Sequence, residues 1–121
     1  MKHKRAKKVI QRVFPRAVEA MKLSDWRIEV KFMSGEHADA PKALMSNAVD
    51  FTYLASIIQV WDPAYELSDD EIAHTLIHEL AHLYTEDLYS IARGNVPPHA
   101  IPFIEEKREQ LTERIARLVR L

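Results

Sequence analysis

The stretch that decides the fold of this 121-residue chain is residues 68–83, SDDEIAHTLIHELAHL. Ser68 and Glu71 match a capping box, in which a serine and a glutamate three residues later bind each other's free backbone N–H groups at a helix start. Leu67 and Ile72 match the hydrophobic staple that often accompanies such a box. The apolar residues that follow recur at the spacing of one helix face: Ile72, Leu76, Ile77, Leu80, Ala81 and Leu83. The stretch therefore predicts a well-capped helix that is buried on at least one side.

Within this helix, His78, Glu79 and His82 form the pattern HExxH. Residues four apart lie one turn above each other on the same helix face, so the two imidazoles can bind one Zn²⁺ at about 2.0–2.1 Å each. Glu79 projects to the side where a metal-bound water would lie, and a carboxylate there can accept the proton of that water. The pattern also arises by chance, but a capped and partly buried helix favours the metal site. We expect His78 and His82 as metal ligands and Glu79 as a catalytic base.

A catalytic zinc ion usually has three protein ligands and one open position, so a third ligand is needed. His74 lies one turn before His78, but three ligands stacked over two turns would span about 12 Å, which is too far for one ion. We expect His74 to contact a ligand or to lie in the core, and the same geometry excludes Glu86. Thr85 and Leu88 stand where the metzincin pattern requires a glycine and a histidine, so that class is excluded.

The last helix, expected over residues 103–121, offers carboxylates instead. Its apolar residues define one face, with Glu105 and Glu109 on the shoulder of that face and Glu106 and Glu113 further toward solvent. A carboxylate beside an apolar face is costly unless something such as a metal compensates it. Glu109 and Glu105 are therefore both candidates for the third ligand. The alternative is that they pair with nearby arginines at the surface.

These residues also carry a resemblance to a known group of enzymes. Residues 69–83 and the ending at residues 109–116 resemble small zincin-like metallopeptidases of bacteria and phages. The ending is similar to the Glu-x-x-Ala-x-x-Phe-Ala pattern of the repressor-cleaving ImmA/IrrE-type group, although Thr112 replaces the first Ala and Ile115 replaces the Phe. The resemblance covers the chain from about Trp26 onward, and only its HExxH part is specific. It implies Zn²⁺ at His78, His82 and Glu109, with Glu79 as the base.

The rest of the chain predicts one α+β domain over residues 1–121. Apolar residues at helical spacing indicate a helix over residues 7–21, which Pro15 should kink or divide into two. The basic head, residues 1–8, is expected to be a solvated helix end that can be flexible, rather than a nucleic-acid arm. Strict alternation predicts a strand over residues 26–32, followed by a hairpin of strands at residues 48–53 and 56–61.

Together these strands predict a small antiparallel sheet of about three strands. The last of them directly precedes the HExxH helix, so it should lie beside the metal and offer a free edge to an extended peptide. The HExxH helix should run to about Ile91 and end at Gly94 and Asn95, and Pro102 should open the last helix. The expected order is therefore an N-terminal helix, the sheet, the HExxH helix and a C-terminal helix.

Composition limits the possible partners and compartments. The chain has 17 basic and 18 acidic residues and a net charge of -1, so its overall charge does not favour nucleic acid as a partner. No apolar run approaches the roughly 20 residues of a membrane span, so no membrane association is expected. The chain contains no cysteine, so a metal would have nitrogen and oxygen ligands only. No export signal is recognisable, and we expect a cytoplasmic protein.

The function that these features predict is that of a zinc metallopeptidase, a hydrolase that acts on a protein or peptide substrate. Donors that stabilise the oxyanion could be Tyr84, Tyr89 or His99, and the sequence does not distinguish among them. The alternative is a non-catalytic, metal-stabilised interaction module of the phage type, which could associate with nucleic acid. Glu79 favours the enzyme, because a structural metal site needs no base.

Overall fold

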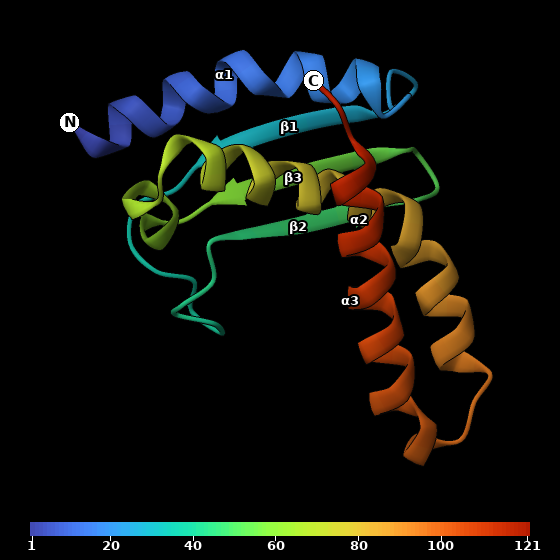
Figure 1. Ribbon diagram of the computed structural model, residues 1–121. Helices are drawn as coiled ribbons and strands as arrows, with labels where there is room; N and C mark the ends of the chain where they lie inside the picture. Colours follow the sequence, from blue (N-terminus) through green and yellow to red (C-terminus); the bar gives the residue numbers. More distant parts are fainter.

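In the computed structural model, which describes residues 1–121, two helices cover one face of a three-stranded sheet, and a third helix packs against the second (Figure 1). The protein has the expected α+β organisation, with an N-terminal helix, a small sheet, the helix that carries HExxH and a C-terminal helix. The core lies between the covered face of the sheet and the first two helices, with Ile10, Ile58 and Leu80 among its most buried side chains. None of the helices is long and apolar enough to cross a membrane.

Helix α1, Lys2–Ala20, is one continuous helix that includes Pro15. Of the two outcomes expected at Pro15, a kink or a division into two helices, the division is therefore wrong. A proline inside a helix costs about 3 kcal/mol through its missing N–H and its steric clash. The buried row of α1 continues on both sides of Pro15, and this packing offsets the cost: Ala6, Val9, Ile10, Val13 and Ala17.

The basic head agrees with the expected solvated helix end, since residues 2–8 form the first turns of α1 and most of them are exposed. Ala6 is fully buried and packs this part of the helix against the core. The Lys2 ammonium lies 2.5 Å from a carboxylate oxygen of Glu66, and the Arg5 guanidinium pairs with Asp69. The helix therefore begins at Lys2, earlier than the predicted start at residue 7.

The sheet consists of β1, Arg27–Phe32, β2, Met45–Asp50, and β3, Ala55–Val60, in the order β1-β3-β2. Strands β2 and β3 form the expected antiparallel hairpin. Strand β2 lies three residues earlier in the sequence than predicted, because residues 51–53, expected at its end, belong to the turn over residues 51–54. Strand β1 pairs with β3 in parallel, so the prediction of an antiparallel sheet was wrong. Strand β3 lies between β1 and β2. Because β2 runs in the direction opposite to β1, and the hairpin reverses the chain once more, β3 runs parallel to β1.

This order also corrects the expected free edge. Strand β3 is central and is paired on both sides, so it has no free edge to offer. The edge next to the HExxH helix belongs to β2, which contacts that helix, whereas β1 forms the opposite edge near α1 (Figure 1). The free edges of the sheet therefore belong to β1 and β2.

Helix α2, Asp69–Gly94, carries the HExxH pattern and follows the 3₁₀ turn η1, Asp62–Glu66. Its capping box is present as predicted, with the Ser68 hydroxyl accepting from the Glu71 N–H and a Glu71 carboxylate oxygen accepting from the Ser68 N–H, both at 3.2 Å. Asn95 is the C-cap, which also agrees with the sequence. The first half of α2 packs on the core, and the second half projects beyond the sheet (Figure 1).

Helix α3, Ile101–Leu118, follows the 3₁₀ turn η2, Pro98–Ala100, and runs back along α2 (Figure 1). The predicted apolar face is packed only in part. Ile115 and Val119 of that face pack against the core, whereas Leu111 is 44% and Leu118 is 77% exposed. The most buried residues of α3 are instead Thr112 and Ala116. The reason is that α3 packs on a partly polar side of α2, where the hydroxyls of Thr85 and Thr112 lie 2.8 Å apart. Compared with the prediction, α3 is therefore rotated about its own axis. In this orientation Glu113 faces α2, although the sequence analysis placed it toward solvent.

Candidate metal centre

The two histidines of the HExxH pattern lie one turn apart on α2, as the four-residue spacing predicts. Their ring centroids are 5.0 Å apart and the ring planes are inclined by 77°. The His78 side chain is 25% exposed and that of His82 is 11% exposed, so one edge of the pair is reached from solvent and the rest is enclosed. Two imidazoles in this arrangement can offer nitrogen atoms to a common point.

Glu109 of α3 lies opposite the two histidines. Its carboxylate oxygens are 3.5 Å from Nε2 of His78 and 3.8 Å from Nε2 of His82. The possible ligand atoms of the three residues all lie within 4.8 Å of one another, close enough to bind a metal ion. Glu105, the alternative third ligand, is not part of this group and accepts a hydrogen bond from the Tyr89 hydroxyl at 3.0 Å.

Each histidine also has a second carboxylate on its other ring nitrogen. Oε1 of Glu113 lies 3.1 Å from Nδ1 of His78 in a hydrogen bond. Oε1 of Glu86 lies equally close to Nδ1 of His82, but the geometry is not that of a hydrogen bond, so Nδ1 of His82 is buried without a hydrogen-bond partner. A carboxylate hydrogen-bonded to one ring nitrogen holds the ring in place and leaves the other nitrogen for a metal, an arrangement common in metal sites. Glu113 therefore orients His78 with Nε2 facing Glu109, whereas Glu86 supplies a nearby charge to His82.

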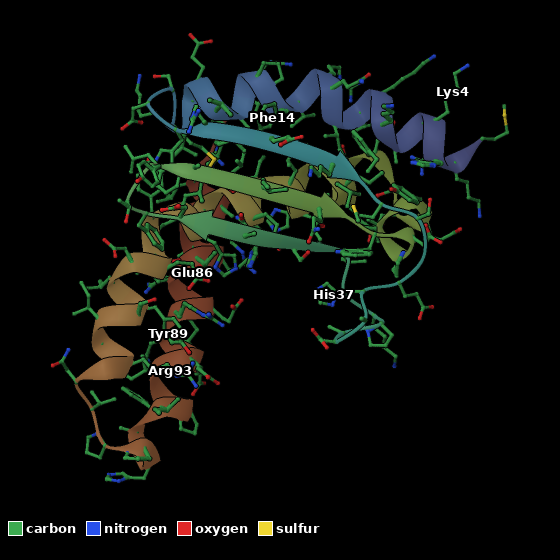
Figure 2. The ribbon with its side chains drawn as sticks, turned by 180° about the vertical axis from the view of Figure 1, so that it is seen from behind. Lys4, Phe14, His37, Glu86, Tyr89 and Arg93 are labelled. Carbon is green, nitrogen blue, oxygen red and sulfur yellow. The ribbon has the colours of Figure 1, made fainter.

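The sequence did not predict these two carboxylates. Glu86 was excluded as a ligand, but its spacing of four from His82 is a signal for side-chain contact on a helix. Glu113 stands four residues after Glu109, which is also the spacing of the two histidines on α2. This equal spacing on the two helices is the signal that could have indicated a contact between Glu113 and a histidine. Figure 2 shows Glu86 on the part of α2 that leaves the sheet, above Tyr89.

An outer layer of charged groups surrounds the two carboxylates. Nε2 of His74 lies 2.9 Å from Glu113, so His74 contacts the carboxylate that holds His78. It neither contacts a proposed ligand nor lies in the core, the two places that the sequence had suggested. Arg108 lies 3.3 Å from both Glu86 and Glu109. Although burial raises the pKa of Glu86 and of Glu113, the facing histidines and arginines hold both values below the usual range. Both carboxylates are thus kept charged next to the histidines.

Glu79 is partly buried beside the cluster. Burial raises its pKa above the usual range for glutamate, and the charges of His82 and His78 only partly oppose this shift. Its backbone carbonyl accepts a hydrogen bond from the Asn47 side chain of β2 at 3.1 Å, which ties the helix to the edge of the sheet. A cavity of about 320 Å³ lies here, lined by Asn47, Val49, Phe51, Glu79, His82, Glu86, Ser90, Arg108 and Glu109.

The three residues considered as oxyanion donors are not brought to this cavity. The Tyr84 hydroxyl donates to the backbone carbonyl of Met21, and the Tyr89 hydroxyl donates to Glu105. His99 is exposed in η2, at the far end of the hairpin of α2 and α3 (Figure 1). Arg108 is the only Lys or Arg that lines the cavity, and the sequence had considered it only as a surface partner for glutamates.

The donor set fits a divalent metal ion. Two imidazoles and one carboxylate form a common ligand set of catalytic Zn²⁺, and the same set also suits Fe²⁺. Tetrahedral Zn²⁺ with bonds of about 2.0–2.1 Å holds its ligand atoms about 3.3 Å apart. The separations of 3.5 Å and 3.8 Å between Glu109 and the histidines are slightly longer, and the group as a whole extends to 4.8 Å, so binding an ion would draw the three side chains together.

No protein-family model, curated protein or solved structure matches this chain. The geometry of the cluster is therefore the basis on which a function can be inferred.

Proposed function

We propose that this protein is a zinc-dependent metallopeptidase with a zincin-like fold, in which His78, His82 and Glu109 hold Zn²⁺. The observation that carries the proposal is the convergence of these three side chains, whose possible ligand atoms lie within 4.8 Å of one another. Glu79 directly follows the first histidine and lies partly buried beside the cluster, which supports a role as general base. A purely structural site needs the ligands but no base, so Glu79 favours an enzyme over an interaction module.

Bound Zn²⁺ supplies Lewis acidity toward a scissile carbonyl and lowers the pKa of a water molecule. The chain's own groups then do the rest. The Glu79 carboxylate accepts the proton of the attacking water and delivers it to the nitrogen of the leaving amine. The upward shift of its pKa brings this group closer to the neutral range, where a general base works best. Glu113 holds the imidazole ring of His78 through Nδ1 and keeps its Nε2 atom aimed at the site, and the nearby Glu86 carboxylate favours a positive charge at His82.

The position of β2 supports a peptide substrate. Strand β2 has a free edge, and its residues Asn47 and Val49 line the same cavity as Glu79 and His82. An extended peptide can pair with such an edge through main-chain hydrogen bonds, which are available whatever its sequence. Pairing along β2 would carry a peptide bond of the substrate past the cluster.

The substitution Glu79→Gln tests this proposal, because it preserves size and helix propensity and removes only the basicity. The zinc-loaded protein should cleave members of a proteome-derived peptide library, and mass spectrometry detects the products. Glu79→Gln should keep its zinc and its melting temperature while cleavage falls by about 10²–10⁴. Glu106→Gln, an exposed glutamate on α3, is the matched control and should cleave like the wild type.

Two results would count against the enzyme. Cleavage that survives Glu79→Gln would show that Glu79 is not the base. A wild-type protein with full zinc occupancy that cleaves no peptide in the library would favour the metal-stabilised interaction module instead.

A further inference from the structure

The basic residues of the chain are concentrated on α1. This helix carries seven Lys and Arg side chains and a single carboxylate, Glu19, whereas the whole chain has 17 basic and 18 acidic residues. The net charge of -1 therefore conceals a strongly positive helix on a chain that is acidic elsewhere. The first turn of α1 contains no acidic residue, so the positive end of the helix dipole adds to the field of these cations.

Four of these cations form a row, which we call the α1 ridge: Lys4, Lys8, Arg12 and Arg16. They stand at successive intervals of four residues, so they follow one another along one side of the helix at steps of about 6 Å over a length of about 18 Å. All four are exposed and none takes part in an ion pair with a carboxylate of the chain. Figure 2 shows Lys4 on the outer side of α1, away from the sheet.

The carboxylates near this helix are already used by other residues. Lys2 pairs with Glu66 and Arg5 pairs with Asp69, so both acids next to the start of α1 are neutralised. Like charges at a spacing of four residues destabilise a helix when no counter-charge is present. The ridge therefore presents cations that have no partner within the protein and that would gain from an external anion.

The surface next to the ridge is hollowed. A depression of about 390 Å³ is lined by Lys4, Lys8 and Arg12 of the ridge, together with Arg5, Val9, Met1 and Asp69. Its one carboxylate, Asp69, is the partner of Arg5. Several cations thus surround one concave surface, which suits a phosphate group better than isolated lysines would.

We propose that the α1 ridge binds the phosphate backbone of nucleic acid, without reading its sequence. A duplex carries one phosphate per 3.4 Å of each strand, so every Lys and Arg of the ridge meets a phosphate within reach of its long side chain. The ridge contains no asparagine, glutamine or aromatic side chain, and its four cations at even spacing match the repeating phosphates, so we assign the contact to the backbone. It lies along α1 beside β1, at the edge of the sheet opposite β2 and the metal centre (Figure 1), so this binding site is separate from the proposed peptidase site.

Two other polyanionic surfaces fit the ridge less well. A helix that binds an anionic membrane inserts its apolar face, but the apolar face of α1 is buried in the protein core through Val9, Ile10 and Val13. The centre of a contact with a protein partner is usually enriched in tryptophan, tyrosine and arginine. The ridge has two arginines but no exposed aromatic side chain beside them. Its regular cations match a repeating anion instead.

The test uses fluorescence anisotropy of a short labelled DNA duplex with the full-length protein. With four phosphate contacts, the logarithm of the binding constant should fall with the logarithm of the salt concentration at a slope of about -3.6. Affinity should therefore drop by about two orders of magnitude between about 50 and 200 mM KCl. Glu79→Gln should bind like the wild type, because the ridge is independent of the peptidase site.

The decisive variant replaces Lys4, Lys8, Arg12 and Arg16 with glutamine. The slope of its binding constant against salt should fall toward zero, and its affinity at low salt should fall by at least a hundredfold. Its melting temperature should not decrease, because the four side chains are exposed and their mutual repulsion is removed. The matched control changes the same number of exposed cations elsewhere, with Lys42→Gln, Arg93→Gln, Lys107→Gln and Arg114→Gln, and should bind like the wild type. Exchanging lysine and arginine along the ridge should also preserve binding.

Three outcomes would overturn the proposal. The first is an equal loss of affinity in the ridge variant and in the matched control, which would make the binding an effect of total charge. The second is a wild-type protein that does not bind DNA even at about 50 mM salt. The third is binding to vesicles of phosphatidylserine and phosphatidylcholine without binding to DNA, which would make the ridge a membrane contact.

Discussion

Replacing Glu113 with glutamine tests whether the carboxylate behind His78 contributes to metal binding. In the structure, Oε1 of Glu113 lies 3.1 Å from Nδ1 of His78 and the side chain is 29% exposed, so the contact is only partly weakened by water. Glutamine keeps the shape and one acceptor oxygen but removes the negative charge that favours the imidazole as a ligand. Loss of such a contact typically lowers metal affinity by 10–100-fold, which is about 1.4–2.7 kcal/mol.

The assay is competition for zinc between the protein and a chromophoric chelator at neutral pH, with a series of three variants. Glu109→Gln, which changes a proposed ligand, should weaken zinc binding most and by at least the same 10–100-fold. Glu113→Gln should follow, and Glu106→Gln, an exposed residue on the same helix, should equal the wild type. The reasoning is refuted if Glu113→Gln binds zinc as tightly as Glu106→Gln. An unchanged affinity in Glu109→Gln with a loss in Glu105→Gln would move the third ligand by one turn.

Three further predictions concern stability, measured by urea unfolding. Ser68→Ala removes the N-cap of α2 and should lower the free energy of unfolding by about 1 kcal/mol, and a change below a few tenths would show that the capping box is not needed. Leu80→Ala, at a fully buried position, should cost about 2–5 kcal/mol, whereas Leu88→Ala, at a position 63% exposed on the same helix, should stay within about 0.5 kcal/mol. In the metal-free protein, burial raises the pKa of Glu79 above 4.5. For His82, burial lowers the pKa, but the nearby carboxylates of Glu86, Glu79 and Glu109 raise it by more, so the net shift places the pKa above 6.5. Both groups then bind more protons in the folded state, so stability with a chelator should fall as the pH rises from about 5 to 8, whereas added zinc should stabilise most at the upper end of that range. A chelated protein that gains stability over this range would contradict the signs of both shifts.

The features that the sequence predicted correctly depend on neighbours along the chain. The capping box at Ser68 and Glu71 and the C-cap at Asn95 are local signals, and α2 begins and ends where they indicate. The two histidines share a face because they stand four residues apart on one helix. The alternation in residues 26–32 likewise predicted β1, with Ile28, Val30 and Phe32 on the more buried side.

The features that the sequence missed depend on how distant segments meet. The parallel pairing of β1 with β3 follows from where the hairpin returns, and no local pattern encodes that choice. The rotation of α3 is set by polar packing against α2, as at Thr85 and Thr112, and not by the apolar residues of α3 alone. That rotation brings Glu113 to His78, so its place in the site could be predicted only after the packing of the two helices was known.

The charged contacts that join α3 to α2 have a consequence for how the protein responds to metal supply. Only Thr112 and Ala116 of this helix are buried, and its contact with α2 includes the pairs of His78 with Glu113 and of Glu86 with Arg108. An ion shared by His78, His82 and Glu109 would fasten the C-terminal segment to the rest of the chain. Depletion of metal should therefore loosen residues 95–121 before anything else unfolds, exposing them to proteases and to rapid amide hydrogen exchange. Uniform protection of α1 and α3 after chelation would show that the segment holds on without the ion; selective loss in α3 would make this helix a reporter of the zinc available to the protein.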